Sequence, residues 1–494
     1  MTRRLVFSSL SSLLLAGAVS VAPAGCARNP VTGKSELSLV SESQEIEMGK
    51  QAEQEVAQTI GYYDDAAAQQ YVSQIGMKIA KASERPNLPW EFHVVNDASV
   101  NAFALPGGYI HVTRGLMTAI NDEAELATVV GHEIGHVTNR HSVQQISKAQ
   151  VAQLGLGLGS VLSPDIARLA GVASQGLQLL FLKYSRDAEN QADMAGFRYA
   201  LNQGYDVRHM TNVMEMLDRE SKLGGGGRLP DWLATHPNPG ARIQHITSML
   251  DTVHRDLSHA IVNREGYLQH IQNMTYGEDP RQGFFEGSAF YHPDLRFQVT
   301  FPQGWQTQNQ PQAVVAMSPQ QDAIIQLGTA GKTPPEQAAR QFLSQQGVQP
   351  GNTSSASVNG LPAAAGYFTA QTDQGAVQGL VTFISYAGNT YGFLGYTPAG
   401  KFSAYDNTFR QTINSFGPLR NQAALNVKPA RVELVKLPRE MTLEQFNSQY
   451  PSSIKLEELV IINEVESPST LLPAGRMVKR VVGGREGVGN AGAL

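Results

Sequence analysis

The sequence HEIGH at positions 132–136 constrains this chain more than any other segment. On an α-helix, residues four apart point the same way, so His132 and His136 can reach one metal ion. The flanking residues predict such a helix. Asp122, followed by Glu125 three residues later, is a typical helix start, and an apolar stripe continues to about residue 141. We therefore expect a helix that carries two histidine ligands.

Glu133 lies between the two histidines and near the apolar stripe of the same helix. A carboxylate on a half-buried helix face is costly unless it has a partner, and a water bound to a metal is such a partner. Zinc takes imidazole ligands at about 2.0–2.1 Å, which suits this spacing. The segment predicts one Zn²⁺ per chain, with Glu133 as the general base.

A catalytic zinc needs a third protein ligand and an open position. The metzincin pattern would place a glycine three residues after His136 and a third histidine six residues after it. Asn139 and Ser142 occupy those positions, so that pattern fails. His141 is five residues past His136 and turns off the ligand face, so we expect it to be a structural histidine.

A second predicted helix, residues 185–202 with Gly204 at its end, supplies the better candidate. Glu189 and Asp193 share one face of it. Glu189 is the expected third ligand, and Asp193 is placed to accept an N–H from a ligand histidine. The alternative is a solvated acidic face, but three small residues on or beside that face favour close contact with the first helix: Ala192, Gly196 and Ala200.

The N-terminus has the layout of a secretory signal peptide over residues 1–25. Cys26 is the single cysteine of the chain, so it cannot form a disulfide within it. Its position after the signal resembles a bacterial lipobox, and Ala27 rather than Asp after it points to the outer membrane of a Gram-negative bacterium. We expect a lipid-anchored periplasmic protein. The alternatives are an uncleaved membrane anchor and a free thiol.

The 494 residues are too many for one compact core, so we expect several domains of α+β class. The expected divisions are a metal-binding domain over 26–275, a separate α+β domain of unknown role over 283–420, and a small unit over 431–482. A net charge of −5 gives no reason to expect nucleic acid as a partner. The apolar stretch 151–182 is broken into pieces too short to cross a membrane, so we expect a loop or flap there.

Beyond the zinc motif, several segments carry a specific resemblance: NPVTGK at 29–34, NAF at 101–103, PGG at 106–108 and THP at 235–237. With the pair of motifs around His132 and Glu189, they resemble the zinc metallopeptidase family that includes HtpX, the CAAX prenyl proteases and BepA. The resemblance covers about residues 27–255. It implies a mostly helical gluzincin domain with a small edge-strand sheet, zinc, Glu133 as base and Glu189 as ligand. The tetratricopeptide repeats of BepA-type proteins have no counterpart here.

The same resemblance suggests roles for residues outside the two helices. Asn101, Ala102 and Phe103 form an extended segment to which a peptide substrate can add as a strand. Arg242 is expected, like Asp193, to support the ligand residues without binding the metal itself. His236 follows a run of four glycines that can act as a hinge. It either fills the open zinc position, as a histidine in a matching His-Pro context does in BepA-type relatives, or donates to the oxyanion; the alternative is a surface histidine.

The leading functional hypothesis is a zinc endopeptidase that hydrolyses envelope polypeptides, in quality control of misfolded or misassembled proteins. A second hypothesis is a non-proteolytic scaffold or chaperone, in which residues 431–482, with their faint likeness to a LysM module, bind peptidoglycan. A zinc hydrolase of small substrates is a third. An intact Glu133 argues against the scaffold, because a purely structural metal site has no use for a base.

Overall fold

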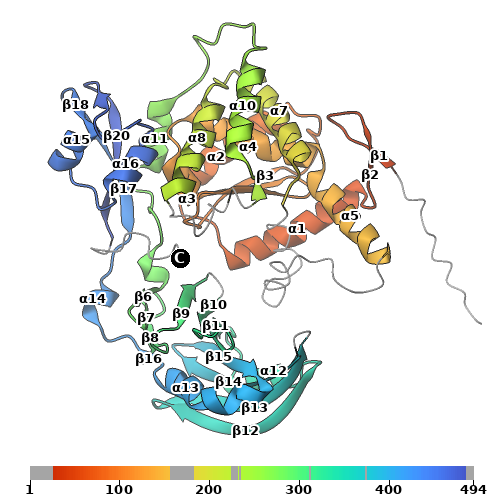
Figure 1. Ribbon diagram of the computed structural model, residues 1–494, viewed down its shortest axis with the longest axis vertical. Helices are drawn as coiled ribbons and strands as arrows, with labels where there is room; N and C mark the ends of the chain where they lie inside the picture. Colours follow the sequence, from red (N-terminus) through yellow and green to blue (C-terminus); the bar gives the residue numbers. More distant parts are fainter. Residues whose placement is uncertain are drawn as a thin grey trace, which may run out of the picture.

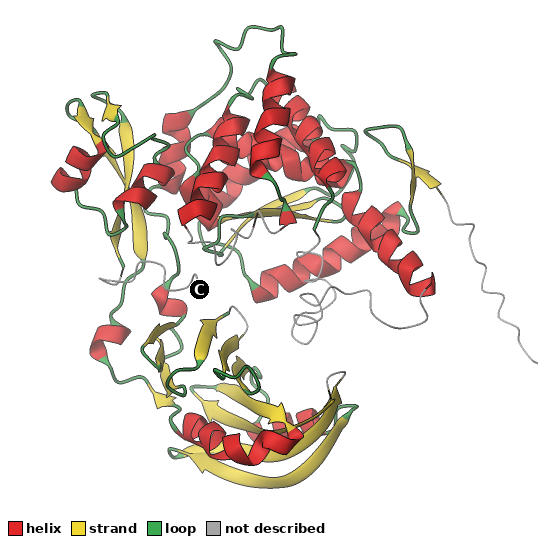
Figure 2. Cartoon of the chain, in the orientation of Figure 1, coloured by secondary structure: helices red, strands yellow, loops and turns green. Residues whose placement is uncertain are grey.

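The computed structural model describes residues 26–155, 183–223, 232, 235–310, 313–372 and 375–484. The predicted signal peptide, most of the apolar stretch 151–182 and the four glycines at 224–227 lie outside these residues. The described chain forms a helical part with a small sheet, a strand-rich part below it and a small unit at one side (Figures 1 and 2). The predicted α+β class is confirmed.

Within the described part of the chain, no helix has both the length and the apolar character needed to cross a membrane.

The helical part begins with two helices and a three-stranded sheet. The order in the sheet is β3-β5-β4, with β3 and β5 parallel and β4 antiparallel at the edge. Ser41 caps the first helix and forms a reciprocal capping box with Gln44. The elements are α1 (Glu42–Thr59), α2 (Ala66–Ala80), β3 (Glu91–Val95), β4 (Ala102–Leu105), β5 (Tyr109–Thr113) and α3 (Arg114–Ala119).

Helix α4 (Glu123–Thr138) carries the HEIGH sequence and is buried along almost its whole length. The Asp122 carboxylate accepts from the Glu125 backbone N–H, as predicted, but the Glu125 side chain accepts from the Asn121 N–H. The helix ends at Thr138, earlier than predicted, because Arg140 takes a left-handed conformation (φ 57°). A separate helix, α5 (His141–Gly155), then starts in a new direction.

Four more helices of this part lie within the described residues, and Figure 1 shows α7, α8 and α10 gathered around α4. The predicted second helix, α7, begins at Ser185, whose side chain caps it, and packs along α4. Small residues permit this contact. A Cβ built on Gly196 would lie 2.6 Å from the backbone nitrogen of His132, which is too close, so only glycine fits there. The helices are α7 (Arg186–Asn202), α8 (His209–Leu223), α10 (Pro239–Leu250) and α11 (Arg264–Ile271).

The strand-rich part is built on a seven-stranded antiparallel sheet of order β12-β13-β14-β15-β11-β10-β9. Two helices cover opposite faces of it: α12 (Pro335–Leu343) packs on Phe368 and Val381, and α13 (Phe402–Asn414) packs on Ile384 and Phe393. A second sheet has the order β16-β8-β7-β6. The strands are β6 (Phe284–Glu286), β7 (Ala289–His292), β8 (Phe297–Thr300), β9 (Gln306–Asn309), β10 (Ala313–Met317), β11 (Ile324–Thr329), β12 (Val348–Val358), β13 (Leu361–Thr372), β14 (Gly375–Tyr386), β15 (Asn389–Pro398) and β16 (Gly417–Pro418).

After a short helix α14 (Gln422–Leu425), the chain forms the small C-terminal unit and returns to the helical part. Val432 and Ile461 join the main core there, and the buried Lys479 ammonium donates to three carbonyls at the end of α3, at 2.9–3.0 Å. The strand-rich part is thus inserted between two segments that pack together. The elements are β17 (Ala430–Lys436), β18 (Met441–Thr442), α15 (Leu443–Gln449), α16 (Leu456–Ile462), β19 (Leu471–Leu472) and β20 (Met477–Gly483).

Candidate metal centre

Four side chains converge beside the middle of α4. His132 and His136 come from α4, Glu189 from α7 and His236 from the segment before α10. One ligand atom from each lies within 4.8 Å of every other, and no side chain is more than 2% exposed. The sequence-predicted ligands are therefore brought together, and His236 joins them.

The spacing of these atoms suits a tetrahedral zinc ion. Ligands at about 2.0–2.1 Å from zinc stand roughly 3.4 Å apart. The Nε2 atoms of His132 and His136 are 3.0 Å apart, and each lies 3.6 Å from a Glu189 oxygen. Two imidazoles and a carboxylate are also the donor set of many catalytic zinc sites. The described residues fit the predicted zinc cofactor, which is confirmed.

Glu133 lies beside this cluster rather than in it. Its side chain is buried, and its Oε1 atom has no hydrogen-bond partner and is 3.8 Å from His236 Nε2. Burial, together with the nearby Glu189 and Asp193, raises the pKa of Glu133 to about 7 despite the cations around it. A buried carboxylate without a partner, next to a metal site, is suited to accept and return a proton near neutral pH.

Behind the ligands, Asp193 and Arg242 hold His132 in place. Asp193 Oδ1 lies 2.9 Å from His132 Nδ1, and the Arg242 guanidinium binds both Asp193 oxygens at 2.6 and 2.9 Å. Arg242 also reaches Glu189, at 3.2 Å. Burial alone would raise the pKa of Asp193, but Arg242 and His132 outweigh it and keep that pKa below its usual value. Asp193 therefore remains an ionised acceptor that orients the His132 ring.

His141 lies outside the group of ligand atoms, as expected, and is a buried histidine with hydrogen-bond partners, one of which is the ligand residue His136. Its Nδ1 lies 2.9 Å from His136 Nδ1, and its Nε2 lies 3.2 Å from Gln191 Oε1. The left-handed turn at Arg140 redirects the chain and brings the ring back. Helical spacing therefore predicted that His141 is not a ligand, but it did not predict the contact of His141 with His136.

Two aromatic residues at the site were missed from the sequence. The Tyr184 ring stacks on His136, with centroids 4.0 Å apart, and its hydroxyl hydrogen-bonds to Ser142. Trp232 is fully buried and meets His132 edge to face at 6.1 Å. The Tyr184 backbone N–H also donates to the Thr235 carbonyl, so the segment before α7 is hydrogen-bonded to the segment before α10. Lone aromatics carry no periodic signal by which they could have been found.

His236 is not a surface residue. Its Nδ1 lies 3.0 Å from Glu189 Oε1 and 3.3 Å from His132 Nε2. Its backbone N–H donates to the Trp232 carbonyl. One of its ring nitrogens lies within 4.8 Å of a ligand atom of each of His132, His136 and Glu189.

The segment 101–103 lies at the free edge of the small sheet. Ala102 and Phe103 begin β4, which pairs only with β5 among the described strands. The Phe103 ring stacks on His111 at 4.6 Å, and the Asn101 side-chain oxygen is buried without a hydrogen-bond partner. The edge therefore offers unpaired backbone groups to an extended peptide.

Comparison with known proteins was consistent with this geometry. The model of peptidase family M48 matches residues 66–250. The mitochondrial metalloendopeptidase OMA1 of Arabidopsis thaliana is 38% identical over 180 residues, which are 35% of this chain and 35% of that protein. The beta-barrel assembly-enhancing protease of Yersinia pestis is 29% identical over 257 residues, 48% of this chain and 52% of that protein. The chain thus spans about half or less of the length of these relatives. The matched residues contain both ligand helices and the His236 segment, and on that evidence residues 66–250 form a peptidase family M48 domain, of the kind found in the HtpX/BepA-type zinc metallopeptidases.

Proposed function

We propose that this protein is a zinc-dependent endopeptidase. The observation that carries the proposal is the convergence of His132, His136 and Glu189 next to Glu133, whose buried Oε1 has no partner. A structural metal site would not need an unsatisfied carboxylate beside its ligands, because such a group costs free energy unless it takes part in a reaction.

In the proposed mechanism, zinc, when bound, polarises the scissile carbonyl and lowers the pKa of the attacking water. Glu133 takes the proton from that water and later passes it to the leaving amine. Asp193, held by Arg242, keeps the His132 ring oriented throughout.

We further propose that His236 gates this site. As a fourth metal ligand, His236 would exclude the attacking water. The protein with His236 in this position would then be self-inhibited. The role of oxyanion donor requires His236 to withdraw from Glu189 and face the substrate carbonyl. Gating suits a protease that must spare intact neighbours, since cleavage would wait for a signal that moves the 235–239 segment.

The substrates in this proposal are extended polypeptides that add as a strand to the edge of β4. Two observations support it: β4 is antiparallel and at the sheet edge, and it packs directly against α4. The names of the relatives, a beta-barrel assembly-enhancing protease among them, agree with quality control of misassembled envelope proteins as the setting. A signal peptide and lipidation at Cys26 would anchor the protein in the periplasm, at the outer membrane.

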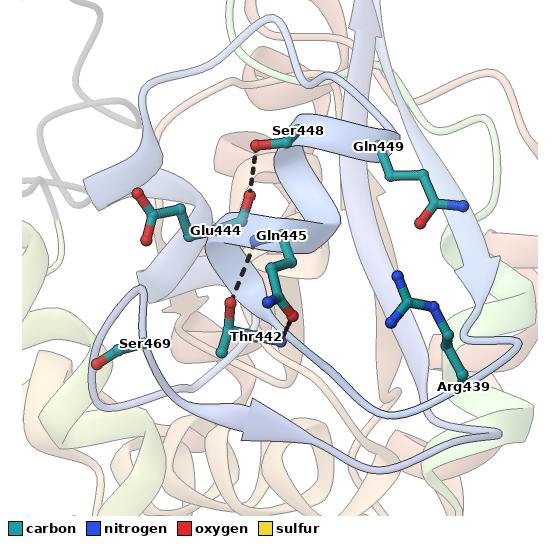
Figure 3. A pocket seen from close by; sticks show the side chains of 7 residues that line it. All are labelled: Arg439, Thr442, Glu444, Gln445, Ser448, Gln449 and Ser469. Carbon is teal, nitrogen blue, oxygen red and sulfur yellow. Dashed lines mark hydrogen bonds between the residues drawn. The ribbon is translucent and has the colours of Figure 1, made fainter.

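Peptidoglycan binding by the C-terminal unit is a second proposal. The unit has two helices between the paired strands β17 and β20, which agrees with the LysM-like pattern in its sequence, and a short pair of strands, β18 and β19, flanks these helices. A shallow groove of about 680 Å³ on it is suited to hydrogen-bonding a glycan through hydroxyl, amide and guanidinium groups (Figure 3). It is lined by Arg439, Thr442, Glu444, Gln445, Ser448, Gln449 and Ser469. Failure of the protein to co-sediment with isolated peptidoglycan would end this proposal.

The peptidase proposal is tested with protein lacking residues 1–26 and an unstructured substrate such as casein. We expect cleavage that a chelator abolishes and zinc restores. Glu133→Gln should retain zinc, measured by elemental analysis, and lose hydrolysis by at least about a hundredfold, the usual contribution of a general base. Loss of zinc in that variant would show that Glu133 is a ligand, and undiminished cleavage would exclude it as the base.

A further inference from the structure

We propose that His141 is a positioning residue that fixes the ring and the tautomer of the zinc ligand His136, through a buried hydrogen-bond chain that ends at Gln191. The proposal rests on the zinc site described above and adds a residue to it. Its basis is the pair of contacts that His141 makes, one on each side of its ring.

The geometry determines which nitrogen carries each proton. The Nε2 of His136 faces His132 Nε2 and Glu189, so this atom is the ligand atom and must be free of a proton. The proton of the neutral ring then sits on Nδ1, which donates to His141 Nδ1 at 2.9 Å. His141 in turn carries its proton on Nε2 and donates to Gln191 Oε1 at 3.2 Å. Only this assignment satisfies both contacts with neutral rings.

The chain connects both ligand helices through α5. His136 is on α4, His141 is the first residue of α5, and Gln191 is on α7 two residues after Glu189. The His141 side chain is 2% exposed, so water does not compete for its nitrogens. On the other side of the ligand ring, Tyr184 stacks on His136. The His136 ring is therefore held by stacking from one direction and by a hydrogen bond from another.

The two histidine ligands are supported by different chemistry. His132 donates to the charged Asp193, which Arg242 neutralises, whereas His136 donates to a neutral imidazole. A neutral acceptor orients the ring without adding negative charge to a buried site that already holds Glu133 and Glu189. Loss of such an acceptor behind a ligand typically costs 10–100-fold in metal affinity.

The experiment measures zinc affinity by competition with a chromophoric chelator, and the Co²⁺ absorption spectrum, in the protein lacking residues 1–26. His141→Leu should weaken zinc binding roughly 10–100-fold and alter the Co²⁺ bands. His141→Asn should restore most of the affinity, because its side-chain oxygen can take the place of Nδ1. His111→Leu is the matched control, since His111 is also buried but contacts Glu53 instead of a metal ligand. The zinc affinity of this variant should equal that of the wild type.

Three results separate the possible failures. Unchanged affinity in a folded His141→Leu variant would overturn the inference, and so would equal losses in His141→Leu and His141→Asn, since packing alone would then explain them. Circular dichroism and thermal melts without metal identify a variant that has unfolded. If His141→Leu has unfolded, the comparison of the wild type with His141→Asn decides. Wild-type zinc affinity in His141→Asn supports the acceptor role, and a loss of tenfold or more contradicts it. If the wild type itself binds no zinc, the proposed function fails instead.

Discussion

The close approach of the two ligand helices at Gly196 predicts a large effect from a single added methyl group. In Gly196→Ala, the new Cβ would lie 2.6 Å from the His132 backbone nitrogen and 2.8 Å from the Gly131 carbonyl carbon. Ordinary contact distances are about 3.5–4.0 Å, so α7 must move away from α4 by roughly 1 Å. Backbone atoms cannot rotate aside as a flexible side chain can.

This displacement should affect both stability and metal binding. Overpacking of this kind costs about 1–3 kcal/mol, and a cost near 2 kcal/mol lowers the Tm of a domain of this size by roughly 4–8 °C. Glu189 is on the same helix and would move with it, whereas zinc–ligand distances tolerate only about ±0.2 Å. We therefore expect zinc affinity to fall at least about tenfold.

Gly240→Ala provides the matched control. Gly240 is also helical, in α10, but a Cβ built on it meets no atom within 4 Å. This variant should match the wild type or gain up to about 1 kcal/mol, because alanine favours the helix. The assays are thermal melts without metal and zinc titration against a chelator. If Gly196→Ala keeps the wild-type Tm and zinc affinity, the close approach of α7 to α4 is not what assembles the site.

Two further predictions concern His236 and His209. His236→Ala should increase cleavage of an unstructured peptide, about tenfold if one molecule in ten is open in the wild type, whereas a large loss at unchanged zinc content would support the oxyanion role. Burial lowers the pKa of His209, but the carboxylates of Asp122, 2.7 Å away, and Glu125, 3.9 Å away, outweigh it and raise that pKa to about 10. Its charge therefore stabilises the fold fully below pH 6.5, and this contribution is lost as the pH rises towards 10. Thermal melts over this range should show a smaller decline in His209→Gln than in the wild type, and parallel curves would contradict the assignment.

Local periodicity determined the elements that carry the chemistry. A spacing of four residues puts His132 and His136 on one side of any α-helix, and the same rule pairs Glu189 with Asp193. Helix starts at Asp122 and Ser185 were also predictable, because a capping side chain acts on the first turn of its own helix. Such features depend on neighbours within a few residues, so the sequence alone contains them.

Contacts between distant segments were decided by the tertiary structure. The position of His141 depends on the left-handed residue Arg140, which changes the direction of the chain between α4 and α5. The burial of Lys479 against the end of α3 depends on the C-terminal unit folding back across more than 350 residues. Neither has a periodic signal, because each results from the relative placement of elements that sequence patterns describe one at a time. The sequence by itself therefore determined which helices hold the metal ligands, and only the packing of those helices decided what surrounds each ligand.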